Sequence, residues 1–475
     1  MNKHTLFFLL LLPATVRGGE SVMTPMEFLN QVRLQNVSFR AIEENGSGAV
    51  NRIREKELLT SPVAYANAST GQDGKPFSPP LFEYDRVDVG NYEIGIRRQN
   101  AYGTEASLSY ALDYTRFRKP SIAGIPISYY DASPVLSVSQ SLWKNRFGRT
   151  TRAQQELIAA QGAAERYDAE FKITGALVEA EVAYWRLSLA REAVRIQEEA
   201  LRQARSILDY VTNREIRHLG DHGDVLQAQA LVESRTLELK AAEDEESSAA
   251  RRFNLIRNTP GTSVPEKLVA IDQRTTADIK PPAEVVARAD VEAAKLRAES
   301  AAANAQILSS QNEPDLQLFG LYALNKRNSG LGEALGDSAS SDSPTRLVGI
   351  KFSMPLAFDA VRDSRQGACQ QSNAAALVYE QKEVDQGREW ADLVERLRAA
   401  QERMGLAHTM EDIQKRKLEF EKRRLREGRT TTYQVLLFEQ DHSQAQLACL
   451  KVAFEVLTLN AQTRLYTGLA GGVSQ

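Results

Sequence analysis

Four stretches of this chain alternate between apolar and polar positions with a period of two residues. In residues 105–117, the apolar face carries Ala106, Leu108, Tyr110, Leu112 and Tyr114. Residues 135–143 and 346–356 alternate in the same way, and residues 315–324 do so less regularly. A period of two over this length predicts β-strands that each present one apolar face.

Elsewhere the apolar period is close to that of an α-helix. Residues 151–211 contain no proline. Apolar or small residues recur there every three or four positions, interrupted once by Gln197, at Ala180, Ala183, Leu187, Ala190, Val194, Leu201, Ala204, Leu208 and Val211. This spacing is a heptad seam, which is typical of a coiled coil. With a turn at residues 219–223 and a further helical run, it predicts a helical hairpin over about 151–257.

The same order of elements occurs twice, which indicates an internal repeat. The first repeat spans residues 19–257, a proline-rich linker spans 258–282, and the second repeat spans 283–475. The second repeat has its own helical hairpin over about 360–466, with a turn near Gly428. Each repeat begins with a helix, and each strand pair encloses a segment predicted as a loop, at residues 118–133 and 326–345.

The N-terminus carries two specific signals. Lys3 and His4 precede a short apolar run that ends at a proline and small residues, so residues 1–18 are predicted to be a secretory signal peptide. Thr24 and Glu27 then form a capping box with proline at the first helical position, which predicts a helix after them.

These elements constrain the architecture. Strands of about 10 residues with an apolar face match membrane-spanning β-strands, but four strands cannot close a barrel, and an open sheet edge is excluded from hydrocarbon. A helix over residues 360–427 would be about 100 Å long, too long for burial in one domain. We therefore expect a mainly α-helical protein whose copies share a membrane β-barrel, with long coiled-coil hairpins next to the strands.

At four places the sequence resembles the TolC family of outer-membrane efflux proteins. Residues 24–40 resemble the opening helix of the family, and residues 183–187 resemble a stretch of its long helices. The segments 136–142 and 348–356 resemble the strand ends that enter these helices. Two turns, Gly220 followed by Asp224-Val225-Leu226 and Gly428 followed by Gln434-Val435-Leu436, resemble the periplasmic tips.

The resemblance implies a homotrimer with a barrel of about 12 strands in outer-membrane lipid. It also implies a periplasmic adaptor (membrane fusion) protein and an inner-membrane pump as partners, in tripartite efflux or type I secretion. Gate candidates at the two tips are Asp221, Asp224, Arg424, Arg426, Gly220 and Gly428. Two features depart from the family: residues 60–100 are longer, with a candidate extra strand at 92–98, and residues 415–426 are strongly basic.

No arrangement of residues indicates catalysis or a cofactor, so we expect no enzyme. His218, Asp221, His222 and Asp224 cluster in a turn, where such residues usually cap helices, and we expect no metal site there. The net charge of −3 excludes an electrostatic case for nucleic acid binding. The competing function is a periplasmic coiled-coil adaptor or scaffold, which would need one hairpin flanked by β-rich domains.

Overall fold

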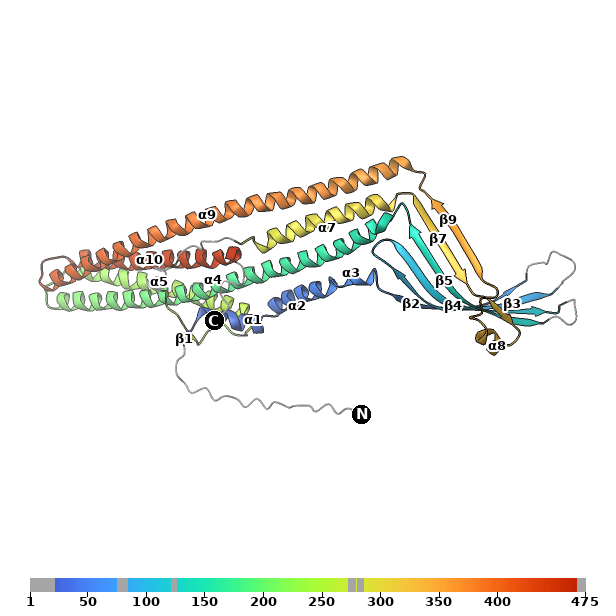
Figure 1. The fold of residues 1–475 in the computed structure, drawn as a ribbon. Helices are drawn as coiled ribbons and strands as arrows, with labels where there is room; N and C mark the ends of the chain where they lie inside the picture. Colours follow the sequence, from blue (N-terminus) through green and yellow to red (C-terminus); the bar gives the residue numbers. More distant parts are fainter. Residues whose placement is uncertain (1–21, 75–83, 121–125, 272–278, 280–285, 468–475) are drawn as a thin grey trace. The chain divides into compact units, whose positions relative to one another are not determined.

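The computed structural model describes residues 22–74, 84–120, 126–271, 279 and 286–467 (Figure 1). The predicted signal peptide, residues 1–18, lies outside the described residues. The chain divides into two compact units that do not follow the two repeats. Unit 1 comprises residues 1–42, 172–286 and 388–475, and unit 2 comprises residues 43–171 and 287–387.

The capping box forms as the sequence predicts. Thr24 Oγ1 accepts a hydrogen bond from the Glu27 backbone N–H at 3.2 Å, and a Glu27 carboxylate oxygen accepts from the Thr24 N–H at 2.8 Å. These bonds satisfy two donors that would otherwise be unpaired at the start of helix α1, Pro25–Gln35. Helices α2 (Val37–Arg52) and α3 (Glu55–Leu58) follow it.

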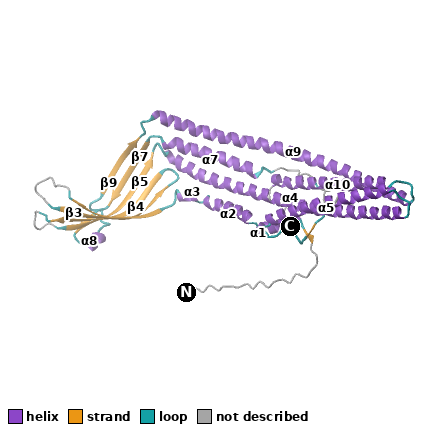
Figure 2. Cartoon of the chain, turned by 180° about the vertical axis from the view of Figure 1, so that it is seen from behind, coloured by secondary structure: helices purple, strands orange, loops and turns teal. Residues whose placement is uncertain are grey.

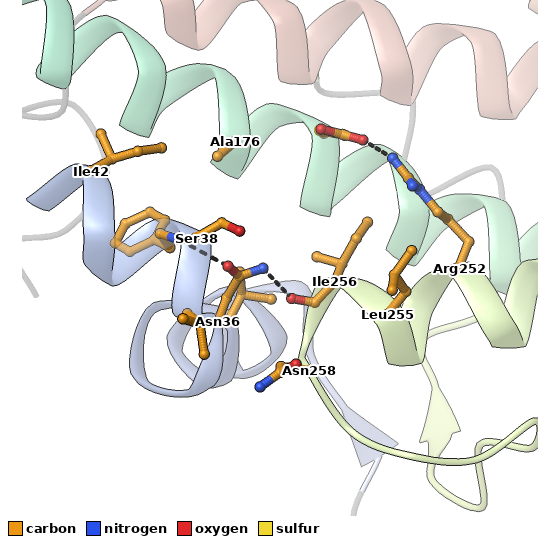
Figure 3. Close-up of a pocket in the computed structure, with 12 residues that line it drawn as sticks. Asn36, Ser38, Ile42, Ala176, Arg252, Leu255, Ile256 and Asn258 are labelled. Atoms are coloured by element: carbon orange, nitrogen blue, oxygen red, sulfur yellow. Dashed lines mark hydrogen bonds and ion pairs between the residues drawn. The ribbon is translucent and has the colours of Figure 1, made fainter.

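Asn36 forms the joint between α1 and α2 (Figure 3). Its Oδ1 accepts from the Phe39 N–H at 2.9 Å, which caps the start of α2. Its Nδ2 donates at 2.6 Å to the carbonyl oxygen of Ile256. A cavity of about 350 Å³ lies at this joint, and the Glu179–Arg252 ion pair also lines it. One side chain therefore caps α2 and ties the joint to a distant segment.

Four long helices form the two hairpins that the heptad pattern predicts (Figure 2). The first consists of α4 (Arg149–Ile216) and α5 (His222–Ile256), and the second of α9 (Phe358–Arg426) and α10 (Thr432–Thr467). Along the predicted seam of α4, Ala180, Leu187 and Ala204 are fully buried. Among the described residues, every helix is too short or too polar to span a bilayer.

The core of unit 1 centres on three aromatic rings. Phe28 stacks on Phe253 with ring centroids 4.0 Å apart, and Tyr184 lies 5.9 Å from Phe28. The Tyr184 hydroxyl donates to the Met23 carbonyl and accepts from the Val269 N–H at 2.9 Å. It thereby connects α4 to the neighbourhood of a two-stranded parallel sheet, β1 (Val22–Met23) with β6 (Lys267–Leu268).

Unit 2 contains helix α7 (Ala289–Gln311) and one antiparallel sheet. Its strands pair in the order β2-β3-β4-β5-β7-β9, and a short strand, β8, pairs with β5 off this path. The bounds are β2 Val63–Asp73, β3 Arg86–Gln99, β4 Thr104–Arg118, β5 Ser128–Ser141, β7 Asp315–Ala323, β8 Lys326–Asn328 and β9 Thr345–Ser353. The β5–β7 pairing joins strands from the two repeats in one sheet.

Three segments differ from the sequence prediction. Residues 63–73 and 86–99 pair as two antiparallel strands, β2 and β3, whereas the sequence indicated only a candidate strand at 92–98. Strand β5 begins at Ser128, inside the predicted loop, because residues 128–134 continue the ladder with β4. The predicted loop 326–345 contains β8 and a short helix, α8 (Leu331–Gly336).

We expect replacement of Asn36 by alanine to lower the unfolding temperature. Asn36→Ala removes the cap of α2 and leaves the Ile256 carbonyl without this donor, a loss of about 1–2 kcal/mol. The change in melting temperature of the purified protein, followed by far-ultraviolet circular dichroism, measures it. Ser38→Ala, at an exposed position two residues away, is the matched control. Equal melting temperatures for the two variants would contradict the role of Asn36.

Candidate functional site

The two hairpin turns lie side by side at the same end of unit 1 (Figures 1 and 2). The first turn connects α4 to α5 and the second connects α9 to α10. The gate candidates predicted from the sequence lie at or next to these turns. The two turns have the same pattern of backbone hydrogen bonds, but different residues occupy it.

The second turn ends α9 with a left-handed glycine. Gly428 has a φ of +70°, a backbone conformation that side chains with a Cβ rarely adopt. The Arg429 N–H donates to the Arg424 carbonyl at 2.8 Å, and the Gly428 N–H donates to the Leu425 carbonyl at 3.0 Å. This pair of bonds is a Schellman motif, and it explains why glycine occupies position 428.

The first turn has the same motif with a different residue in the left-handed position. The Leu219 N–H donates to the Arg214 carbonyl and the His218 N–H to the Glu215 carbonyl, both at 2.8 Å. His218 therefore occupies the place of Gly428, with a φ of +55°. Gly220, which the sequence aligned with Gly428, lies two residues further along the chain. The two turns are alike in backbone hydrogen bonding but not in their glycines.

The charged gate candidates make contacts within their own hairpins. Asp221 is the N-cap of α5 and accepts from the Gly223 N–H at 2.9 Å. Asp224 lies in the first turn of α5, where a carboxylate is favoured by the helix dipole. Arg424 pairs with Glu421 at 2.9 Å and donates to the Arg429 carbonyl at 3.1 Å. Arg426 is exposed.

An apolar cluster behind the turns holds the two hairpins together. Its buried members come from α4, α9 and α10, and Leu231 of α5 packs against them; they are Ile207, Leu418, Leu425, Val435, Leu436 and Phe438. Burial of each such side chain contributes about 1.5–3 kcal/mol. The turns therefore rest on a common core formed by all four helices.

The basic segment 415–426 is more than a solvated face, because two of its lysines pair with acids on α10. Lys422 forms an ion pair at 2.9 Å with Glu439, whose side chain is only 3% exposed. Lys417 pairs with Asp441 at 3.3 Å, and its ammonium lies 3.7 Å from the centre of the Phe438 ring. These contacts connect the two arms of the second hairpin and contribute to their alignment.

The sheet of unit 2 is a second candidate functional surface. Register places apolar side chains of all six strands on one face, among them Ala66, Ile94, Tyr110, Leu136, Tyr322 and Val348. Exposure on this face is high, at 64% for Ile94 and 79% for Val348. The opposite face is mostly polar, and Ser107 bonds Ser137 there. An exposed apolar band opposite a polar face is the pattern of a membrane barrel wall.

The comparisons with known proteins agree with this arrangement. The outer membrane efflux protein family model matches residues 284–471. Over these residues, the chain matches the outer membrane efflux protein, or TolC, family. The model covers the second repeat, with α7, β7, β9, α9 and α10. A search of curated proteins found no match to the sequence.

Solved outer-membrane channels share the fold of this chain. The channel OprN aligns with 93% of this chain and 89% of its own, with a TM-score of 0.65 and 19% identity. VceC of Vibrio cholerae aligns over 93% and 95%, with a TM-score of 0.64 and 17% identity. MtrE of Neisseria gonorrhoeae, solved in an open state, aligns over 94% and 89%, with a TM-score of 0.64 and 15% identity.

The family fits the sequence prediction of an outer-membrane efflux channel with a periplasmic helical extension. Members of the family are transporters and not enzymes, and TolC-like channels form trimers. The adaptor or scaffold alternative needs a single hairpin, whereas this chain has two hairpins and a sheet that joins strands of both repeats.

One cluster of chemically active side chains was not identified from the sequence. His408, Glu411 and Cys449 bring one possible metal-ligating atom each to within 4.8 Å of one another. The turn residues His218, Asp221, His222 and Asp224 do not form such a group in the part of the chain that the structure describes. His222 instead contacts Glu215 at 2.7 Å.

The Lys422–Glu439 pair predicts an asymmetric response to mutation. Lys422→Ala leaves a buried carboxylate without its cation and should cost about 3 kcal/mol, seen as a lower melting temperature. Lys422→Met combined with Glu439→Leu should recover most of this loss, because an apolar pair can replace a buried ion pair.

Arg416→Ala is the matched control, because Arg416 and its partner Asp412 are both largely exposed. Exposed pairs contribute about 0–1 kcal/mol, so this variant should melt close to the wild type. A loss for Lys422→Ala no larger than that for Arg416→Ala would show that the buried pair does not hold the hairpin.

Proposed function

We propose that this chain forms a homotrimer in which three copies of the six-stranded sheet close one barrel in the outer membrane. The channel serves a tripartite efflux or type I secretion system, with a periplasmic adaptor and an inner-membrane pump as partners. The observation that carries the proposal is the exposed apolar face that continues across β2, β3, β4, β5, β7 and β9.

The ends of this strand path supply the interface between copies. The path ends at β2 and β9, so one edge of each strand is left without a neighbour within the described sheet. An unpaired edge cannot remain in hydrocarbon, because each free N–H and C=O group there costs several kcal/mol. All strand pairs along the path are antiparallel, so six strands leave β2 and β9 running in opposite directions. Strand β9 of one copy can therefore continue the antiparallel ladder with β2 of the next.

The β2–β3 hairpin changes the size of the expected barrel. Three copies of six strands give 18 strands, where the sequence-based resemblance implied about 12. Eighteen is an even number within the range of strand numbers in outer-membrane barrels. A barrel of this size is wide enough for an aqueous channel. The hairpin has the same alternation as its neighbours, with Tyr92, Ile94 and Ile96 on the apolar face. It is therefore suited to be part of the barrel wall.

Cysteine cross-linking tests which strands meet between copies. In a Cys369→Ser, Cys449→Ser background, Ile350→Cys in β9 is combined with Ala64→Cys, Ala66→Cys or Ala68→Cys in β2. At least one register should yield covalent trimers on oxidation of outer-membrane fractions, because all these positions share the apolar face. Denaturing gels without reductant measure the product.

The matched control combines Ile350→Cys with Leu108→Cys in β4, which lies inside the proposed six-stranded path. This pair should not cross-link. Cross-linking of β9 to β4 in place of β2 would mean that the β2–β3 hairpin lies outside the barrel and that four strands per copy close it. A protein recovered as a soluble periplasmic monomer would overturn the proposal altogether.

The hairpin turns are the proposed gate at the periplasmic end. A tunnel narrowed there must open to pass cargo, and helix pairs open by hinge motions at such ends. Arg424, Arg426, Asp221 and Asp224 are among the charged residues close to the two turns. Each exposed pair contributes about 0–1 kcal/mol, so a ring of several copies is needed to hold a closed state.

Replacing Arg424 and Arg426 together by alanine should raise single-channel conductance in planar bilayers. The double variant removes two positive charges per copy from the gate, and it removes the bond from Arg424 to the Arg429 carbonyl. High salt should reduce the difference, because it screens exposed charge. Arg416→Ala, further from the turn, is the control and should conduct as the wild type. Unchanged conductance and ion selectivity in the double variant would place the gate elsewhere.

A further inference from the structure

The two arms of the second hairpin bring together three metal-ligating side chains of different kinds. His408 and Glu411 are three residues apart on one face of α9, and Cys449 lies opposite them on α10. His408 is 20 residues before Gly428 and Cys449 is 21 residues after it. Residues equally far from the turn of an antiparallel hairpin lie side by side, so this contact follows from the fold itself.

The distances among these side chains fit a cation. Cys449 Sγ lies 3.1 Å from His408 Nδ1, and that nitrogen lies 3.9 Å from a Glu411 carboxylate oxygen. Thiolate, imidazole and carboxylate ligands at tetrahedral angles around zinc are separated by about 3.3–3.6 Å. Small side-chain adjustments are therefore enough to centre an ion among the three atoms.

The surroundings also suit a bound cation. The cluster lines a groove of about 220 Å³ together with Met404, whose buried position is one helical turn before His408. Cys449 is 5% exposed, whereas His408 and Glu411 are partly exposed, so the groove gives solvent access to one side of the cluster. Arg195, which also lines the groove, is paired with Glu192 at 2.8 Å. The positive charge of Arg195 is therefore balanced by Glu192 on the side of the groove that an entering cation passes.

We propose that His408, Glu411 and Cys449 form a binding site for a thiophilic divalent cation of the zinc type. Cysteine, histidine and glutamate are all established zinc ligands, and three protein ligands leave one position for water. A bound ion would join α9 to α10 about 20 residues from the turn and fix their alignment. This site lies outside the sheet face and outside the gate candidates, so it does not depend on either.

In the metal-free protein the same atoms form a simpler contact. Burial and the neighbouring Glu411 carboxylate raise the pKa of the Cys449 thiol to about 12, so the sulfur carries a proton at neutral pH. A neutral thiol next to an imidazole is a hydrogen-bonded pair without any ion. An experiment must therefore separate ion binding from a thiol–imidazole hydrogen bond.

Cobalt(II) is the probe, because thiolate bound to cobalt produces a charge-transfer absorption band that imidazole and carboxylate alone do not produce. The full-length protein is purified in detergent through a tag without histidine. The wild type should bind one cobalt ion per chain with this band, and zinc should remove the band by displacement. Cys449→Ser should abolish it.

Cys369→Ser is the matched control, because Cys369 is the other free thiol and is exposed on the same helix as His408. This variant should keep the full band. Glu411→Gln changes a partly exposed side chain, so the fold should persist, and it should weaken zinc binding by about 10-fold or more. Circular dichroism of each variant verifies folding.

Two results would overturn the site. The first is a wild-type protein that gives no charge-transfer band. The second is a band that persists in Cys449→Ser or disappears in Cys369→Ser. Either result would leave the cluster as a thiol–imidazole hydrogen bond only.

Discussion

The structure depends most on one constraint, which is that backbone hydrogen bonds of a sheet in a membrane must all be satisfied. The six-stranded path ends at two edges, β2 and β9, which cannot satisfy it within the described chain. Helices satisfy their own backbone groups, so the hairpins impose no such requirement. In the proposed barrel, the need for further copies therefore comes from the sheet, and the number of strands per copy determines the width of the channel.

The hairpin turns place distant residues in contact by a simple rule. Helices that run antiparallel from a turn bring together residues equally far from it, as the Cys449–His408 contact and the Lys417–Asp441 pair show. Each turn is fixed by a Schellman motif, so the number of residues between a side chain and its turn is well defined. The distance of a residue on α10 from Gly428 therefore determines which side chains of α9 it contacts.

The sequence predicts the helices well because their signals are local. The Thr24–Glu27 capping box and the heptad seam of α4 each depend on residues a few positions apart. The β2–β3 hairpin was largely missed because its outward residues on β2 are alanines, which give weak alternation; its register is set by pairing with β3 and β4. Strand β5 begins earlier than predicted because residues 128–134 pair with residues on β4 that a local pattern does not reveal.

The ion pairs of the candidate site are also set by residues that are far apart in the sequence. The basic run 415–426 has some acidic partners on its own helix, and Glu421 is the partner of Arg424. The partners of Lys417 and Lys422 lie on the other arm, beyond the turn. Glu439 is almost fully buried, so loss of Lys422 would leave a buried carboxylate without the cation next to it. A charge pattern along one helix is therefore interpretable only after the opposite arm has been aligned with it.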